Sequence, residues 1–315
     1  MELLPNIHQL IFPLIPEVWG SLYLLTGDRL AIVDTGVEST ISDVLVPYLR
    51  ELSLSLEDVE SIVISHPHYD HAGGAHDLQD RIPDAERMGH PYTLDVMVDP
   101  LAVCRNQRAQ YPYDHPYVGV STEEMEAAVG KPAAIQRCLA DGEVIHLGDR
   151  DWRVVYTPGH NPGLLSLLDE EHGVMLVTDS CQGDGTVDGI PIYEDLVAYY
   201  QTLDRIEGLA PDVLVVSHPF QPQCTSMYKK AEVVRFLEEC RQISEGYSEW
   251  MLHHMRALPL NYTLGEITDD LRQTADCSGE RFYTVMSVRA HLEWLTAQGE
   301  IECYNTPTGM RWKAV

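Results

Sequence analysis

One segment of the chain reads Ser65-His66-Pro67-His68-Tyr69-Asp70-His71-Ala72-Gly73-Gly74 and places three histidines and one aspartate within six positions. It directly follows the apolar run Ser61-Ile62-Val63-Ile64, so we expect it to begin where a β-strand ends. Neutral imidazole nitrogen and carboxylate oxygen are ligands that Zn²⁺ and similar borderline ions prefer. A histidine-rich surface loop is the alternative, but four ligand-type residues at HxHxDH spacing favour a metal site.

Four more motifs follow apolar, strand-like runs. In chain order they are Val33-Asp34-Thr35-Gly36, Thr157-Pro158-Gly159-His160-Asn161-Pro162-Gly163, Leu176-Val177-Thr178-Asp179 and Val213-Leu214-Val215-Val216-Ser217-His218. Together with the histidine-rich segment, they resemble the motifs of the metallo-β-lactamase superfamily, in the same order and over residues about 30 to 220. Because five motifs agree in order and context, the resemblance is specific.

The resemblance implies a site for two divalent metal ions. One ion would be held by His66, His68 and His160, and the other by Asp70, His71 and His218, with Asp179 bridging the two. Zn²⁺ suits this mixture of ligands best, although Mn²⁺ and Fe²⁺ also accept imidazole together with carboxylate. Two ions about 3.5–4 Å apart can share a water molecule and lower its pKa, which would provide a bridging hydroxide as the nucleophile.

Two aspartates have further expected roles. Asp70 would act in catalysis as well as in metal binding, by orienting the hydroxide or by passing its proton to the leaving group. Asp34 would support the metal site by accepting a hydrogen bond from a ligand histidine. An aspartate before Thr-Gly also favours a turn, and the sequence leaves these two interpretations of Asp34 open.

The order of strand-like and helical runs predicts an α/β fold, and the resemblance implies the αββα sandwich of the superfamily. Residues 1–225 would form this catalytic domain. Within it we expect a hairpin that turns at Gly27-Asp28, a helix over residues 41–52 and a helix over residues 192–209.

The remaining residues, 226–315, would form a separate helical domain. Helical periodicity predicts a long helix over residues 229–255, a second helix that begins at Leu264 and a third over residues 283–298. Two short strands complete the chain. This order of helices and hairpin resembles a winged-helix module.

An insertion at residues 89–141 is aromatic rather than rich in Gly and Ser. It would form either a lid over the metals or a pair of packed helices that covers a sheet face. The residues expected to line the substrate pocket are Tyr69, Tyr111, Tyr113, Tyr117, Arg105, Arg108, Cys181 and Gln182. The two arginines could clamp an anion or lie on a solvated face, and the cysteine could instead be a packing residue.

The formal net charge of −28 bears on the partners of the protein. Such a surface repels phosphate backbones, and residues 226–315 hold ten Lys and Arg against thirteen Asp and Glu, without a basic stripe. We therefore expect a small acyl substrate rather than nucleic acid, and a C-terminal domain that packs or forms a homodimer. The sequence shows no membrane-length apolar run, no signal-peptide pattern and no CxxC pair among its seven cysteines, which favours a cytoplasmic protein.

Three functional hypotheses follow. The first is a metal-dependent hydrolase of a small carboxylic ester, thioester or lactone, similar to the glyoxalase II-like and β-lactamase-like protein 2 branches of the superfamily. The second is an endoribonuclease, because the β-lactamase-like protein 2 branch includes such enzymes. The third is a non-catalytic binding or regulatory protein that retains the fold, which the complete ligand set disfavours.

Overall fold

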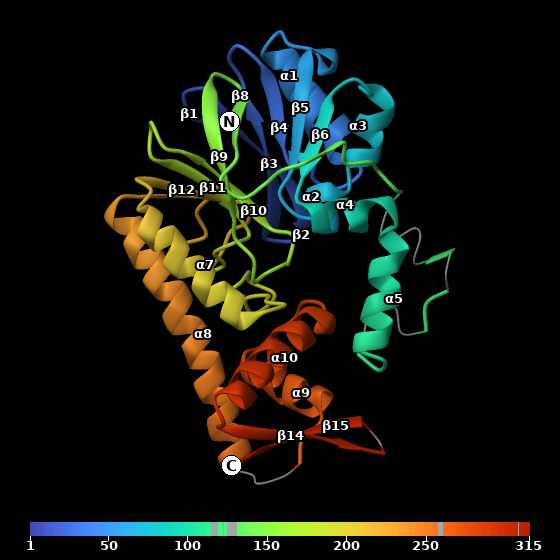
Figure 1. Ribbon diagram of the computed structural model, residues 1–315, viewed down its shortest axis with the longest axis vertical. Coiled ribbons are helices and arrows are strands. Elements are labelled where there is room, and N and C mark those ends of the chain that lie inside the picture. The colour runs from blue at the N-terminus through green and yellow to red at the C-terminus, as the bar shows by residue number, and fades with distance from the viewer. Residues whose placement is uncertain (115–118, 122, 125–130, 258–260, 308) are drawn as a thin grey trace.

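The computed structural model describes residues 1–114, 119–121, 123–124, 131–257, 261–307 and 309–315. Two β-sheets pack face to face, with helices on their outer sides (Figure 1). A smaller group of helices with a hairpin lies at the C-terminal end of the chain, below the sheets in this view (Figure 1). The chain is therefore an α/β protein with a C-terminal helical part, which confirms the predicted fold class.

The first sheet follows the order of the chain. Its strands are β1 (Glu2–Leu4), β2 (Ile7–Ile15), β3 (Val18–Leu25), β4 (Leu30–Val33), β5 (Val59–Ile64), β6 (Glu86–Gly89) and β7 (Arg137–Cys138). β3 and β4 form the hairpin expected around Gly27-Asp28, whereas β4, β5 and β6 run parallel. Parallel strands are usually buried on both faces, which explains why β4 and β5 are largely continuous apolar runs.

The second sheet has the order β13-β12-β11-β10-β9-β8. Its strands are β8 (Val144–Leu147), β9 (Arg150–Tyr156), β10 (Leu165–Asp169), β11 (Val174–Thr178), β12 (Val213–Val216) and β13 (Met227–Lys229). Buried hydrogen bonds join the two sheets at the end of β12. The Tyr23 hydroxyl donates to the carbonyl of Val216 (2.7 Å), and the Ser21 hydroxyl donates to the carbonyl of Ser217 (3.1 Å).

Alternate side chains of the central strands point into two different apolar layers, because successive side chains of a strand point to opposite faces of the sheet. In β5, Ile62 and Ile64 pack towards the helices on the first sheet, whereas Val63 packs between the sheets. In β11, Met175 packs towards the helices on the second sheet, whereas Leu176 packs between the sheets. The sheets and their helices thus form four layers.

The helical segments of the sandwich are a π-helical turn (Ile41–Leu45) that leads into α1 (Val46–Glu51), a 3₁₀ turn (Leu56–Asp58), α2 (Tyr69–Ala72), α3 (Ala75–Arg81), α4 (Pro91–Val98), α5 (Pro100–Gln110) and α7 (Leu196–Leu209). α4 and α5 lie within the insertion at residues 89–141. α7 starts four residues later than expected. The reason is local: the side chain of Asp195 accepts a hydrogen bond from the Ala198 amide (3.0 Å) and caps the helix.

The C-terminal part consists of α8 (Ala231–Ala257), α9 (Leu264–Thr274), α10 (Arg281–Ala297), β14 (Ile301–Thr306) and β15 (Gly309–Ala314). The expected boundary between residues 225 and 226 does not coincide with a structural break. β13 pairs with β12, and the first half of α8, including Val233 and Phe236, packs on the second sheet. The sandwich therefore continues into α8. The winged-helix assignment of the remaining elements stays a prediction.

The helix α10 joins the two parts of the molecule. Its residues Val288 and Leu292 pack in the C-terminal core, whereas Ala290 packs with the helices on the second sheet. At its first turns, Phe282 packs against Tyr111, which follows α5. Among the helices of the described residues, none is long and apolar enough to cross a membrane.

Candidate metal centre

The expected ligands follow the ends of strands from both sheets. β5 leads into the segment that carries His66, β11 ends directly before Asp179, and β12 ends two residues before His218. His160 lies in the connection between β9 and β10. Because polar residues at the carboxyl ends of parallel strands share one edge of a sheet, the topology brings these side chains to a common seam between the two sheets.

Two glycines let the histidine-rich loop turn tightly into α3. A Cβ atom at Gly73 would lie 2.4 Å from the carbonyl oxygen of Tyr69, and one at Gly74 would lie 2.6 Å from the carbonyl oxygen of Thr35. Neither position has room for a side chain. Between the strand and these glycines, the short helix α2 presents Asp70 and His71 beside His66.

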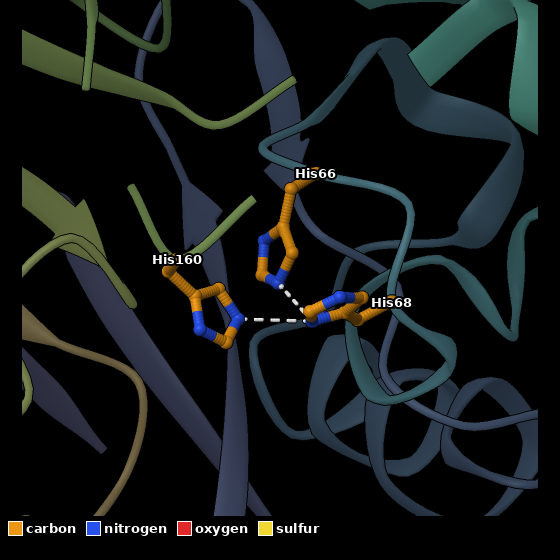
Figure 2. Close-up of side chains that lie close together, drawn as sticks. All are labelled: His66, His68 and His160. Carbon is orange, nitrogen blue, oxygen red and sulfur yellow. Dashed lines mark hydrogen bonds between the residues drawn. The ribbon is translucent and has the colours of Figure 1, made fainter. Parts of the chain in front are cut away.

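Three imidazole rings form the first group of ligand atoms. Figure 2 shows that His66 and His160 each turn a nitrogen towards His68. The Nε2 atom of His66 lies 3.1 Å from Nδ1 of His68, and Nε2 of His160 lies 2.9 Å from the same atom. Two nitrogens that bind one Zn²⁺ ion at 2.0–2.1 Å with tetrahedral angles would be about 3.3–3.4 Å apart. The observed separations are close to this value.

The second group consists of Asp70, His71 and His218. The Nε2 atoms of the two histidines lie 3.3 Å apart. Oδ2 of Asp70 lies 3.2 Å from Nε2 of His218 and 3.6 Å from Nε2 of His71. These three atoms therefore also surround a common point, and they come from both sheets.

Asp179 lies between the two groups. Its Oδ2 atom is within 3.4–4.0 Å of an Nε2 atom of each of four histidines, namely His66, His71, His160 and His218. Its Oδ1 atom is buried and has no hydrogen-bond partner among the described residues. A buried carboxylate oxygen without a partner is costly unless a cation binds it. The donor set and this orphaned oxygen fit divalent metal ions.

Groups outside the ligand set form hydrogen bonds with the candidate ligands and orient them. Asp34 is fully buried and accepts hydrogen bonds from Nδ1 of His71 (2.8 Å) and from the amide (2.7 Å) and hydroxyl (2.8 Å) of Ser65. Its left-handed backbone (φ 63°) shows that it also makes the turn after β4, so both interpretations of Asp34 hold. Nδ1 of His160 faces the carbonyl of Ile192, and Nδ1 of His218 faces that of Trp19. Such contacts fix the ring orientation and the proton position of a metal ligand.

The charges of the site are strongly coupled. Burial alone would lower the pKa of His218, but Asp179 and Asp70 outweigh burial and raise it to about 10. Burial also lowers the pKa of His71, but the nearby carboxylates of Asp179 and Asp70 outweigh it and hold this pKa well above its usual value. By contrast, burial and the neighbouring His160 lower the pKa of His68 to about 3. A divalent ion must displace protons from the first two rings in order to bind, whereas it finds His68 neutral.

The expected pocket residues have different surroundings. Tyr69, within the histidine-rich segment, is 42% exposed, and Tyr113 is 81% exposed. Arg105, on α5, pairs with Asp99, which precedes that helix (2.5 Å). Arg108 also lies on α5. Tyr111 is buried against Phe282 and lies under the Arg289 guanidinium, 4.9 Å from its ring centre. Tyr117 lies outside the described residues.

Two of the expected pocket residues point into the protein instead. Cys181 is fully buried in the apolar cluster beneath α7 and α8. Gln182 is 2% exposed, and its side chain lies behind His160, with Nε2 2.6 Å from Nδ1 of that ring. Both follow the sharp turn at Thr178, whose left-handed backbone (φ 46°) directs the chain back into the core.

The sequence did not reveal two residues near the site. Glu194 accepts a hydrogen bond from the side chain of Asn161 (2.9 Å), beside His160, and burial raises the pKa of its carboxyl to about 7. Tyr283, on the first turn of α10, is half exposed, and burial of its hydroxyl together with the charge of Asp70 raises its pKa to about 12. Neither lies in a motif, and only the packing of α10 brings Tyr283 near Asp70.

Comparisons with known proteins agree with this geometry. The chain is 26% identical to the probable metallo-hydrolase YqjP of Bacillus subtilis over 216 residues, which are 62% of this chain and 66% of that protein. It is 28% identical to the acyl-coenzyme A thioesterase MBLAC2 of Homo sapiens over 213 residues, 62% of this chain and 70% of that protein. It spans 52% of the Gallus gallus MBLAC2, at 28% identity over 158 residues and 49% of this chain. The match thus covers less than two thirds of some of these relatives.

Solved structures extend the likeness to the whole chain. A metallo-β-lactamase family protein from Thermus thermophilus is 26% identical, with a TM-score of 0.80 and full coverage of both chains. A β-lactamase domain protein from Burkholderia ambifaria shares the fold at 20% identity, with a TM-score of 0.72, 100% coverage of this chain and 93% of that one. A sequence model described as the metallo-β-lactamase superfamily matches residues 20–218. With these candidate ligand groups at the seam of two sheets, the chain belongs to the metallo-β-lactamase superfamily.

Proposed function

We propose that the chain is a metal-dependent hydrolase that cleaves a carboxylic ester-type bond, with a small acyl thioester as the first candidate substrate. The convergence of two ligand groups on Asp179, whose Oδ2 atom lies within 3.4–4.0 Å of four histidine nitrogens and whose Oδ1 atom has no partner among the described residues, carries this proposal. A ligand set that is complete in its chemistry and geometry also favours an enzyme over a non-catalytic protein that retains the fold.

The residues around the ligand groups have distinct tasks in this proposal. Two divalent ions, Zn²⁺ first and Mn²⁺ or Fe²⁺ as alternatives, would supply an activated water molecule and polarise the carbonyl group under attack. The Asp70 side chain is 26% exposed, whereas that of Asp179 is 7% exposed, so Asp70 is the carboxylate open to substrate. The oxygen of this carboxylate that does not face the metal would take a proton from the attacking water and give it to the leaving group. Tyr283, near Asp70, would donate a hydrogen bond to the substrate.

Support for a thioester comes from the relatives and from the surroundings of the site. The human relative is an acyl-coenzyme A thioesterase by name. Tyr69, next to Asp70 in the chain, offers exposed aromatic surface that suits an apolar acyl group. Esters and lactones present the same carbonyl group to the same site, and they are therefore the next substrates to examine.

The structure gives less support to cleavage of RNA. In the predicted module, α10 would be the recognition helix, but ten of its residues are buried. Its Arg289 pairs with Glu293 (2.7 Å) and covers Tyr111. A nucleic-acid surface instead needs a row of available basic side chains.

The test begins with metal analysis of the purified full-length chain, followed by chelation and reloading with Zn²⁺, Mn²⁺ or Fe²⁺. The reloaded protein is assayed with a short-chain acyl-coenzyme A, an aryl ester, a lactone and bis(p-nitrophenyl) phosphate. We expect two ions per chain, thioester hydrolysis that chelation abolishes, and recovery on reloading. The His68→Ala variant should lose activity, because it removes the Nδ1 atom that the Nε2 atoms of His66 and His160 both face.

His146→Ala is the matched control. His146 is an exposed histidine on β8 that pairs with Asp151, and its loss should leave metal content and activity unchanged. A metal-loaded protein that hydrolyses only the phosphodiester would replace the thioesterase proposal with the nuclease hypothesis. A folded protein that binds no metal would overturn both.

A further inference from the structure

The His160 ring depends on an irregular stretch of backbone for its orientation. Its Nε2 atom belongs to the first ligand group, and its Nδ1 atom lies 3.0 Å from the carbonyl oxygen of Ile192. When Nε2 faces a metal ion, Nδ1 carries the proton and donates it to this carbonyl. The Gln182 side chain also lies against this ring, with Nε2 2.6 Å from Nδ1, but an NH₂ group cannot accept the Nδ1 proton. The Ile192 carbonyl can accept it, so the position of Ile192 helps to set the direction in which the ligand nitrogen points.

The backbone around Ile192 belongs to no helix or strand, so its polar groups rely on side chains. On one side, Oε1 of Gln182 accepts a hydrogen bond from the Ile192 amide (2.7 Å). On the other side, the Ser287 hydroxyl donates to the carbonyl of Pro191 (2.6 Å) and accepts from the amide of Tyr193 (3.2 Å). Ser287 thus holds the residues immediately before and after Ile192.

Ser287 lies on α10, in the C-terminal part of the molecule, and is fully buried. It is separated from Pro191 by 96 positions in sequence. Its single hydroxyl serves both neighbours of Ile192 at once, because a hydroxyl can donate one hydrogen bond while it accepts another. Without it, the Pro191 carbonyl and the Tyr193 amide would lose these bonds in a region closed to water.

We infer that Ser287 is a positioning residue for the metal centre: through residues 191–193, α10 fixes the orientation of the His160 ligand. The inference rests on the proposed metal site, but not on the identity of the substrate. It assigns α10 a role in metal binding, although none of the proposed ligands lies beyond His218.

The size of the effect follows from the number of contacts between Ser287 and the ring. Loss of a group that directly contacts a ligand typically weakens metal binding about 10- to 100-fold. Ser287 acts one step further away, and Gln182 continues to hold Ile192 from the other side. We therefore expect Ser287→Ala to weaken zinc binding roughly 3- to 10-fold, which is smaller than the loss of a direct contact.

The test compares Ser287→Ala with Thr284→Val, since each substitution removes one hydroxyl from α10. Thr284 is 3% exposed and accepts a hydrogen bond from Arg272 (3.0 Å) within the C-terminal part, away from residues 191–193. Zinc affinity is measured on the full-length, metal-stripped proteins by competition with a chromogenic chelator, and unfolding of the metal-free proteins is measured in urea.

Both variants should lose some stability, but only Ser287→Ala should bind zinc more weakly, and Ser287→Thr should restore the affinity. Equal zinc affinity in Ser287→Ala and the parent protein would overturn the inference, as would equal weakening in both hydroxyl deletions. Should Ser287→Ala not fold, Ser287→Cys, which keeps the volume with a weaker donor, is subject to the same comparison. These measurements use no substrate, so their result can be interpreted even if the protein does not hydrolyse a thioester.

Discussion

Replacement of Asp34 by asparagine should weaken metal binding while the protein still folds, at a comparable cost in stability. Asparagine has nearly the same size and also tolerates the left-handed backbone at this position (φ 63°). Its amide oxygen can accept from the Ser65 backbone, as Oδ1 of Asp34 does at 2.7 Å. Its NH₂ group then replaces Oδ2, the atom that accepts from the Ser65 hydroxyl and from Nδ1 of His71, each at 2.8 Å.

The consequences differ for these two donors. The serine hydroxyl can rotate and accept a hydrogen bond instead. The His71 ring cannot present Nδ1–H to an NH₂ group, so its proton moves to Nε2, the atom 3.4 Å from Oδ2 of Asp179. A protonated Nε2 cannot bind a metal ion. The expected loss of metal affinity is about 10- to 100-fold, or about 1.4–2.7 kcal/mol. The fold should lose roughly 1.5–3 kcal/mol, the typical contribution of one hydrogen bond to a charged group.

Asp34→Ala provides the contrast. It leaves the Ser65 amide and Nδ1 of His71 without this acceptor, at about 1–3 kcal/mol each, and it places alanine in a left-handed conformation at roughly 1 kcal/mol more. We expect about 3–7 kcal/mol from these contributions, enough to unfold a marginal protein. Chelator competition for zinc and urea unfolding measure the two effects separately. Parent-like zinc affinity in Asp34→Asn would refute this reasoning and reduce Asp34 to a turn former.

Three further substitutions test other parts of the structure. Burial raises the pKa of Glu194 to about 7, so the free energy of unfolding falls as the pH rises from about 4.5 through 7. Glu194→Gln should therefore raise the free energy of unfolding by about 1–3 kcal/mol at pH 8.5 and change it little at pH 4, as measured by urea unfolding. Gly159→Ala should lower the free energy of unfolding by more than about 3 kcal/mol, because the added Cβ atom would lie 2.5 Å from Cα of Tyr199. Gly208→Ala is the control and should not lower it, because a Cβ atom there has no neighbour within 4 Å. Tyr283→Phe should lower kcat/KM for the hydrolysed ester roughly 2- to 12-fold without changing metal content, as the loss of one hydrogen bond would; an unchanged kcat/KM would remove Tyr283 from the reaction.

The sequence was sufficient for the strands and for the grouping of the ligands. Ligand-type residues such as His66, Asp179 and His218 follow continuous apolar runs, and buried parallel strands both require such runs and end at a common edge. The helices α8 and α10 were predictable for a similar reason, because apolar residues recur along them at helical spacing. Their bounds differ by one or two residues from the expected ones at each end, because periodicity does not define the last residues of a helix.

The direction of side chains after a turn was not predictable. Gln182 follows Asp179 closely in sequence, yet it lies behind His160 rather than in the pocket, because the chain turns at Thr178. The contacts of Ser287 were also hidden, since a serine on a helix gives no sign of a partner 96 positions away. The continuation of the second sheet past residue 225 was hidden for a related reason, because the short strand β13 pairs with β12 after the change in sequence character.

The hydrogen bonds from Tyr23 and Ser21 to the end of β12 bear on how the protein assembles. Each sheet carries an incomplete set of ligands, His66 to His71 on one and His160, Asp179 and His218 on the other, and these hydroxyls couple the sheets just before His218. Neither half alone can build the centre. Metal binding at the proposed centre would therefore require both sheets to be assembled, and a bound ion would hold together segments that are distant along the polypeptide.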